Sequence, residues 1–187
     1  MAKEEPSGII QIKISLLDTD PKIYRRILVD ENTYLNILHE IIQDAMGWEN
    51  YHLHQFVKDK IIYGEPDPEG WIVCEDEMNY TIGDLAPKTG AKFLYEYDFG
   101  DGWRHEIRRE KLSKKITTLS HPICIEGQYA CPPEDCGGVY GYYDLLEVIS
   151  DPKNPRHEET MEWVGEEFDP NFFDLDVVNT RLQSTEY

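Results

Sequence analysis

The sequence has no long apolar run, and this absence restricts where the chain can function. No apolar stretch approaches the ~20 residues that a membrane-spanning helix needs. The first residues, MAKEEPSG, also lack the apolar segment of a secretory signal. We therefore expect a cytoplasmic protein with no membrane association.

Basic residues are scarce, since 18 Lys and Arg stand against 37 Asp and Glu for a net charge of -19. Nucleic-acid affinity depends largely on Lys and Arg replacing condensed counterions, so we do not expect nucleic acid as a partner. The one basic run is interleaved with Glu106 and Glu110, which favours an exposed strand face with mixed charges. Its members are Arg104, Arg108, Arg109, Lys111, Lys114 and Lys115.

The negative charge is concentrated in the last third of the chain. Residues 126–187 contain 15 acidic and 3 basic residues, which accounts for -12 of the net -19. Such a surface could dock a protein partner with a basic surface. It could equally serve only to keep the protein soluble.

Cysteine is also scarce, with Cys74, Cys124, Cys131 and Cys136 in a chain that shows no secretion signal. We expect thiols unless the cysteines bind metal. Cys131 and Cys136 enclose the stretch CPPEDCGG, but no second pair follows to complete a four-ligand zinc site. A rigid connector is the simpler interpretation, because the two prolines stiffen the loop.

Hydrophobic periodicity predicts strands first and helices last. Alternating apolar residues over 10–16 and 23–29 predict a hairpin, and residues 51–64 and 92–112 predict two more. Helical spacing begins at Tyr34 and ends at Gly47, with Asn32 or Thr33 as the expected N-cap. Further helices are expected over 141–150, 155–164 and 175–182, after a strand at 121–130.

These elements predict an α+β fold with a mostly antiparallel or mixed sheet built from hairpins. One amphipathic helix follows the first hairpin, and the C-terminal helices pack on the sheet. We expect a single domain over residues 1–187, mainly sheet plus one helix over 1–125 and acidic and mainly helical over 126–187. The helices should pack through Leu145, Leu146, Ile149, Trp163 and Phe168.

The stretch YEYDFGDGWRHEI, residues 95–107, concentrates glycines, aspartates and aromatics around one turn. A three-residue loop with Gly102 in the left-handed region would pair Phe99 with Trp103 and Tyr97 with His105. This register keeps the aromatic residues and His105 on one buried face. Asp98 is then expected on the opposite face beside Arg104, so that Asp98, Asp101 and His105 do not form a site by themselves.

Other residues could still form a metal site. His52 and His54 share one strand face at i and i+2, although two packed imidazoles are the simpler interpretation. The predicted metal set, if zinc or another divalent ion binds, is His52, His54, Cys131 and Cys136; the simpler expectation is no cofactor. The wider candidate pocket consists of His52, His54, Tyr97, Asp101, Trp103, His105, Cys131, Glu134 and Asp135.

Taken together, several segments resemble the plasmid pRiA4b ORF-3-like family. In order they are IYRRILV, LNILHEIIQDAMGW, HLHQF, YEYDFGDGWRHEI, ACPPEDCGG with GYYDLL, and FDPNFFDLDVVNTRL. The match extends from about residue 8 to 183 and departs from the family at Tyr24, where a Trp is expected. The resemblance implies the α+β fold of that family and an association with plasmids and insertion elements. It transfers no catalytic residue to this chain.

Two hypotheses about function follow. The first is a non-catalytic binding or adaptor domain that serves a mobile element through protein contacts. The second is a metal-assisted hydrolase whose site gathers His52, His54, His105, Cys131 and Glu134 in one cleft.

Overall fold

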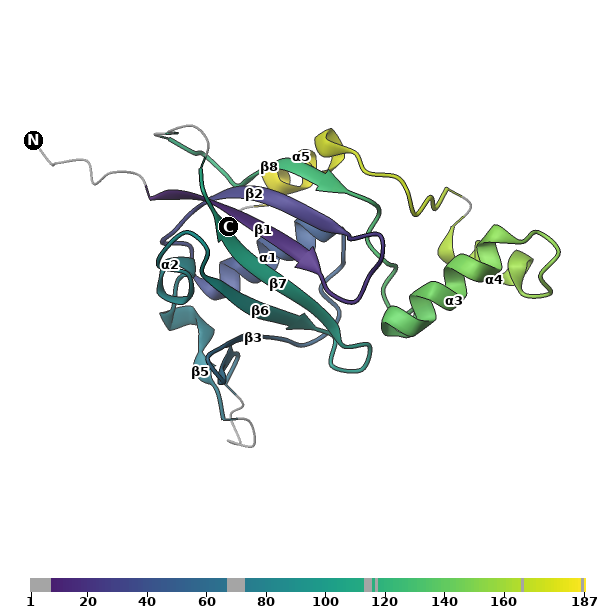
Figure 1. The fold of residues 1–187 in the computed structure, drawn as a ribbon, viewed down its shortest axis with the longest axis horizontal. Helices are drawn as coiled ribbons and strands as arrows, with labels where there is room; N and C mark the ends of the chain where they lie inside the picture. Colours follow the sequence, from purple (N-terminus) through teal and green to yellow (C-terminus); the bar gives the residue numbers. More distant parts are fainter. Residues whose placement is uncertain (1–7, 67–72, 113–115, 117, 166, 186) are drawn as a thin grey trace, which may run out of the picture.

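The computed structural model describes residues 8–66, 73–112, 116, 118–165, 167–185 and 187. These residues form one eight-stranded sheet and five α-helices (Figure 1), which confirms the predicted α+β class. In chain order the elements are β1 (Ile9–Leu16), β2 (Tyr24–Asp30), α1 (Leu35–Met46), β3 (His54–Lys58), β4 (Ile61–Gly64), β5 (Glu75–Asp76), the 3-10 helix η1 (Glu77–Asn79), α2 (Ile82–Leu85), β6 (Lys92–Tyr97), β7 (Trp103–Glu110), β8 (Ile123–Gln128), α3 (Gly138–Ser150), α4 (His157–Val164) and α5 (Leu175–Ser184).

The strand order is β5-β4-β3-β6-β7-β1-β2-β8. Every neighbouring pair is antiparallel except β4 and β5, which are parallel, so the sheet is mixed and built mainly from hairpins. The start of β7 pairs with the end of β1, and the start of β3 pairs with the end of β6. The turns around residues 17–23, 48–53, 98–102 and 129–137 therefore meet at one end of the sheet.

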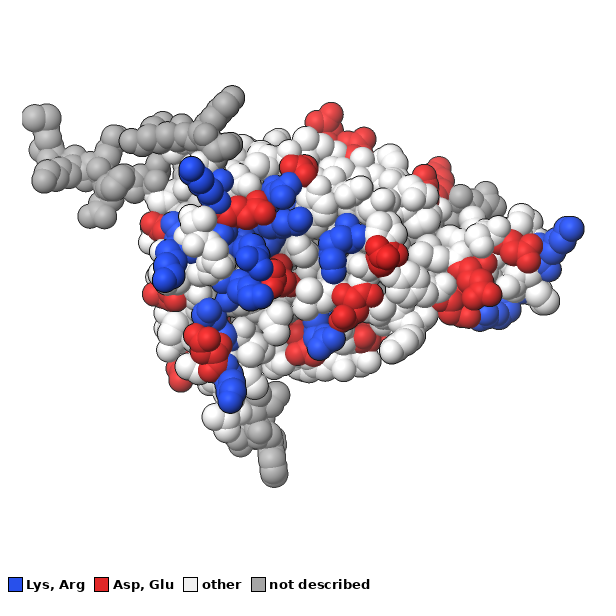
Figure 2. Space-filling view, viewed as in Figure 1, with Lys and Arg blue, Asp and Glu red and all other residues white. Residues whose placement is uncertain are grey.

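One face of the sheet packs on α1 and the other is open to solvent. Ile12 and Ile14 of β1 are fully buried together with Leu38 and Ile42 of α1, as alternation along a half-buried strand requires. The open face carries a mixture of Lys, Arg, Asp and Glu side chains (Figure 2). Residues of the predicted basic run take part in ion pairs there, including Arg104 with Asp18 at 2.7 Å.

Helix α1 ends as predicted but begins differently. Gly47 takes φ +92°, and the Trp48 N–H turns back to the Gln43 carbonyl at 3.1 Å. The expected cap from Asn32 or Thr33 is wrong, because Tyr34 is the N-cap residue and no side chain caps the helix. The first turn is instead satisfied from a neighbouring segment, where the Tyr80 carbonyl accepts from the Leu35 N–H at 2.9 Å.

The C-terminal helices differ in how they contact the rest of the chain. Helix α5 packs against α1 and β8 through the buried Val178 and Leu182, and the Asn179 side chain bonds both backbone groups of Cys124. Helices α3 and α4 pack on each other and extend away from the sheet (Figure 1). Leu146 and Phe168 pack against the main core as expected, and Leu145 is buried outside that cluster. The expectation for Trp163 is wrong, since its residue surface is 53% exposed on α4.

In the part of the chain that the structure describes, no helix combines the length and the apolarity that crossing a bilayer would take.

Candidate metal centre

The hairpin quoted above places its aromatic face as predicted, but its register differs by two residues. Tyr97 pairs with Trp103 and Tyr95 pairs with His105, so the predicted Tyr97–His105 and Phe99–Trp103 pairs are wrong. Both registers bury the same face, because a shift of two residues keeps every side chain on its side. The loop spans residues 98–102, and Phe99 is 46% exposed.

Asp98 is the reason that the strand ends early. It takes φ +54°, and its Oδ1 accepts hydrogen bonds from the Gly100 and Asp101 N–H groups at 3.0 and 3.3 Å. This turn moves Asp98 off the strand face where alternation placed it, and Asp18 takes its expected place beside Arg104. The carboxylate of Asp98 is buried, and its Oδ2 lies 3.7 Å from Nε2 of His52.

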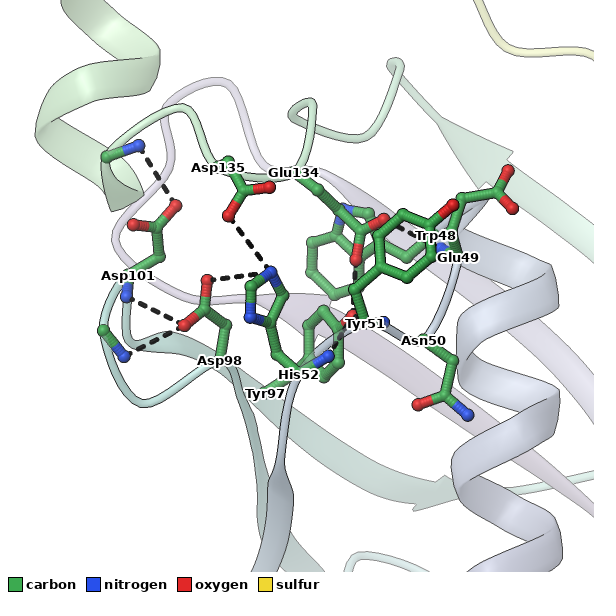
Figure 3. A network of polar contacts seen from close by, with 12 residues as sticks. Trp48, Glu49, Asn50, Tyr51, His52, Tyr97, Asp98, Asp101, Glu134 and Asp135 are labelled. Carbon is green, nitrogen blue, oxygen red and sulfur yellow. Dashed lines mark hydrogen bonds and ion pairs between the residues drawn. The ribbon is translucent and has the colours of Figure 1, made fainter.

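The loop that contains CPPEDC reaches the same place from the other end of the chain (Figure 3). Glu134 accepts a short hydrogen bond from the Tyr97 hydroxyl and a second from the Glu49 N–H at 2.9 Å. On the other side of the loop, Oδ2 of Asp101 accepts from the Gly137 N–H at 3.0 Å. Asp135 lies between these two anchors, which direct its carboxylate toward His52.

His52, Asp98 and Asp135 form the cluster that we call the carboxylate–imidazole triad. One donor atom from each residue lies within 4.8 Å of the others, and Nε2 of His52 is 3.1 Å from Oδ1 of Asp135. Although Nε2 is buried, it makes no hydrogen bond to either carboxylate, since the Asp98 oxygen is too distant at 3.7 Å and the closer Asp135 oxygen is not aligned with it. The imidazole therefore faces both carboxylates without donating well to either.

The backbone around His52 is held by Tyr97, whose side chain is fully buried. Its hydroxyl accepts from the N–H groups of Tyr51 and His52 at 2.9 and 3.3 Å, and its ring contacts the His52 imidazole edge to face. Burial and the Glu134 carboxylate raise the pKa of Tyr97 well above its usual range. Tyr97 therefore stays protonated and acts as a fixed donor to Glu134.

The other two histidines of the predicted pocket lie elsewhere. His54 stacks on His39 with ring centroids 3.5 Å apart, and its Nε2 contacts the Glu77 carboxylate at 2.9 Å. His105 is fully buried beside Trp48, and burial lowers its pKa to about 3. Its neighbour Trp103 is likewise fully buried in the core.

The cysteines do not join the triad. Burial raises the pKa of the Cys136 thiol to about 12 and that of Cys131 further still, so both remain protonated thiols. Within the described residues, the group with metal-ligand spacing consists of the triad alone, which differs from the predicted set of His52, His54, Cys131 and Cys136.

Five residues of the predicted pocket lie in this network, and Asp98 is the member of the triad that was not among those predicted. His52, Tyr97, Asp101, Glu134 and Asp135 lie together, as Figure 3 shows. Asp98 was missed because strand alternation placed it on the opposite face. Its position after an alternating strand and before Gly100 was the only available signal, since Asp readily begins turns of this kind.

Comparison with known proteins gives a family for this chain. The family model described as "Plasmid pRiA4b ORF-3-like protein" matches residues 8–177. A relative from Sinorhizobium fredii, "Uncharacterized protein y4hQ", is 39% identical over 160 residues, covering 85% of this chain and 82% of the relative.

A solved structure agrees with this match. The crystal structure titled "Protein of Unknown Function MM3350", from Methanosarcina mazei Go1, has a TM-score of 0.81 and 36% identity to this chain. The match covers 92% of this chain and 98% of the chain in that crystal structure. The chain belongs to the plasmid pRiA4b ORF-3-like protein family.

Proposed function

We propose that the chain binds a divalent cation through His52, Asp98 and Asp135 and acts as a metal-dependent hydrolase. The observation that carries this proposal is the His52 Nε2 atom, which is buried between two carboxylates without a hydrogen bond. Ligands held ~2.1 Å from a metal at tetrahedral angles lie about 3.4 Å from one another. The distances from His52 Nε2 to the Asp135 and Asp98 carboxylates, 3.1 and 3.7 Å, bracket that value.

The donor set favours zinc or manganese. Imidazole nitrogen suits zinc and iron, whereas carboxylate oxygens also suit manganese. Asp98 resembles a held ligand, because two backbone N–H groups fix one oxygen while the other faces the cluster. Such support orients a ligand without changing its charge.

Three protein ligands with one open position are typical of catalytic rather than structural zinc sites. The Asp135 side chain is 67% exposed, so the solvent side of the triad is accessible to water and substrate. A cation there would lower the pKa of a bound water toward neutrality and polarise a carbonyl or phosphoryl oxygen. Hydrolysis is the reaction class that this chemistry supports.

The competing interpretation is an ion pair, in which a protonated His52 bridges the two carboxylates and only holds the loop in place. Titration calorimetry with zinc and with manganese distinguishes the metal site from the ion pair. We expect about one ion per chain, and an affinity that falls by about tenfold or more in Asp135→Asn, since removal of one charged ligand weakens coordination. Asp59→Asn, at the exposed β3–β4 turn, is the matched control and should bind as the parent does.

Two results would contradict the metal proposal. One is the absence of any binding tighter than about millimolar for both ions. The other is an Asp135→Asn variant that lowers the stability of chelator-treated protein while metal leaves the stability of both proteins unchanged. That second pattern identifies the ion pair.

A second candidate function is binding of a protein partner with a basic surface. In this hypothesis the partner links the chain to a mobile element. The supporting observation is helix α4, which projects from the sheet and carries exposed Glu158, Glu159 and Glu162 beside the half-exposed Trp163. Binding should weaken as salt rises. A gel-shift series with DNA and RNA at low salt should show no complex. Micromolar nucleic-acid binding that is lost on changing Arg104 and Arg108 would contradict this reading.

A further inference from the structure

A groove separate from the triad lies between the end of α1, residues 130–134, and the residues Val164, Phe168 and 172–181. Its volume is about 550 Å³, within the range of ~300–1,000 Å³ that small-molecule sites occupy. The walls are mostly apolar and include Trp48, Pro132, Pro133, Phe168, Phe172 and Phe173. Phe172 is 56% exposed at the rim, so an apolar surface here faces solvent.

Two arginines line this apolar groove. Arg25 is only 3% exposed, and its guanidinium donates to three backbone carbonyls, those of Tyr24, Ala45 and Gln128. The ring of Phe173 covers it at 4.6 Å. All of these partners are neutral, and burial lowers the pKa of Arg25 accordingly.

Arg181 adds a second positive charge. A Cβ atom at Gly47 would lie 2.2 Å from Nη1 of Arg181, so the guanidinium rests against the C-terminal end of α1. Arg181 is close enough to disfavour the charged form of Arg25. Among the described residues, no carboxylate forms an ion pair with either arginine, although the chain as a whole is strongly acidic.

Three carboxylates also line the groove, but among the described residues none of them forms an ion pair with either arginine. The end of helix α1 contributes about half of one negative charge. Asp174 caps α5 by accepting from the Asp176 and Val177 N–H groups, and Glu134 is bonded to Tyr97 and Glu49. Glu49 is exposed at the rim. Because neither guanidinium has a carboxylate partner among the described residues, an anion in the groove would gain charged hydrogen-bond donors.

We propose that this groove binds a small-molecule carboxylate with an apolar body. The body would lie against Trp48 and the phenylalanines. The carboxylate would contact Arg181 and Nη2 of Arg25, the nitrogen of that guanidinium that makes no hydrogen bond among the described residues. A guanidinium presents parallel N–H donors that match a planar carboxylate, and a single charge suits a mostly apolar groove better than a phosphate does. The site does not depend on the metal centre, since it shares no ligand with the triad.

The test uses the full chain and two probes with the same body, phenylbutyrate and phenylbutanol, measured by titration calorimetry. Inorganic phosphate tests the charge without the body. We expect phenylbutyrate to bind about tenfold more tightly than phenylbutanol and than phosphate. Arg181→Gln should remove most of that difference, whereas Arg156→Gln, on the exposed arginine of the Asp144 ion pair, should not.

Arg181 is the chosen variant because it is exposed, whereas replacing the buried Arg25 risks unfolding the protein. Each remaining outcome overturns the proposal. Equal affinity for phenylbutyrate and phenylbutanol would exclude the arginines as the reason for binding, and equal affinity for phosphate would exclude the apolar walls. The absence of phenylbutyrate binding at about millimolar concentration, or an unchanged Arg181→Gln, would reject the site itself.

Discussion

Lowering the pH from 7 to 5 should strongly destabilise this protein, because two histidines are buried in their neutral form. His39 is 3% exposed, bonded to the Tyr95 hydroxyl and to Asn50 at 2.8 Å each. His105 is fully buried, and neither of its ring nitrogens makes a well-aligned hydrogen bond, although nearby backbone groups favour its charged form slightly. The pKa of both residues is lowered to about 3, mainly by burial, and in His39 the neighbouring His54 contributes to the shift.

The size of the effect follows from proton linkage. An unfolded histidine titrates near pH 6.5, so below that pH the unfolded chain binds protons that the folded chain does not bind. Stability is therefore present above pH 6.5 and is lost as the pH falls toward 3. Each buried histidine should cost about 2 kcal/mol between pH 7 and pH 5, or about 4 kcal/mol for the pair. That loss is a large fraction of the ~5–15 kcal/mol by which a domain of this kind is stable.

Urea unfolding at pH 7, 6 and 5 measures this loss directly. His105→Leu should remove about half of the pH dependence, and His121→Gln, in the loop before β8, should leave it unchanged. Carboxylates with a lowered pKa, such as Glu106, Glu110 and Glu126, add to acid sensitivity only near and below pH 4.5. A free energy of unfolding that stays constant from pH 7 to 5, or a His105→Leu variant with the parental slope, would refute the reasoning.

Three further predictions concern stability and architecture. Tyr97→Phe should lower the free energy of unfolding by about 3 kcal/mol in urea unfolding, because the Glu134 carboxylate and the Tyr51 N–H lose their partner. The control Tyr140→Phe, at a residue that is 91% exposed, should have no effect. Gly138→Ala would place a Cβ 2.3 Å from the Asp101 carbonyl oxygen and should lower the free energy of unfolding by more than about 2 kcal/mol. The control Gly90→Ala should lower it by only about 1 kcal/mol, because φ is also positive there but no atom lies within 4 Å of the added Cβ. Limited proteolysis should release no folded fragment of residues 1–125, because Val178 and Leu182 of α5 belong to the same core as α1; recovery of such a fragment would contradict the single-domain proposal.

The fold was predictable to the extent that local patterns determine it. Alternation predicted the hairpins, and the helical period with Gly47 predicted α1 and its end. Asp174 caps α5 and Gly165 ends α4, as their positions in the sequence predicted. The start of α1 was not predictable, because its first N–H is satisfied by Tyr80, a residue 45 positions away. Contacts of that kind leave no signal in a single sequence.

The candidate site shows the same limit more sharply, because its ligands are placed by departures from regular structure. Asp98 and Asp135 both take positive φ, at +54° and +57°, where residues other than glycine are uncommon. In the regular extended strand that alternation assumes, Asp98 would face away from His52. Asp135 reaches the imidazole only because Glu134 and Gly137, on either side of it, bond Tyr97 and Asp101 of another hairpin. Aspartate tolerates this backbone region better than most residues, yet two such residues converging on one histidine require support from the surrounding hydrogen bonds. Two carboxylates held against one imidazole by these supports are the arrangement on which the proposed cation site depends.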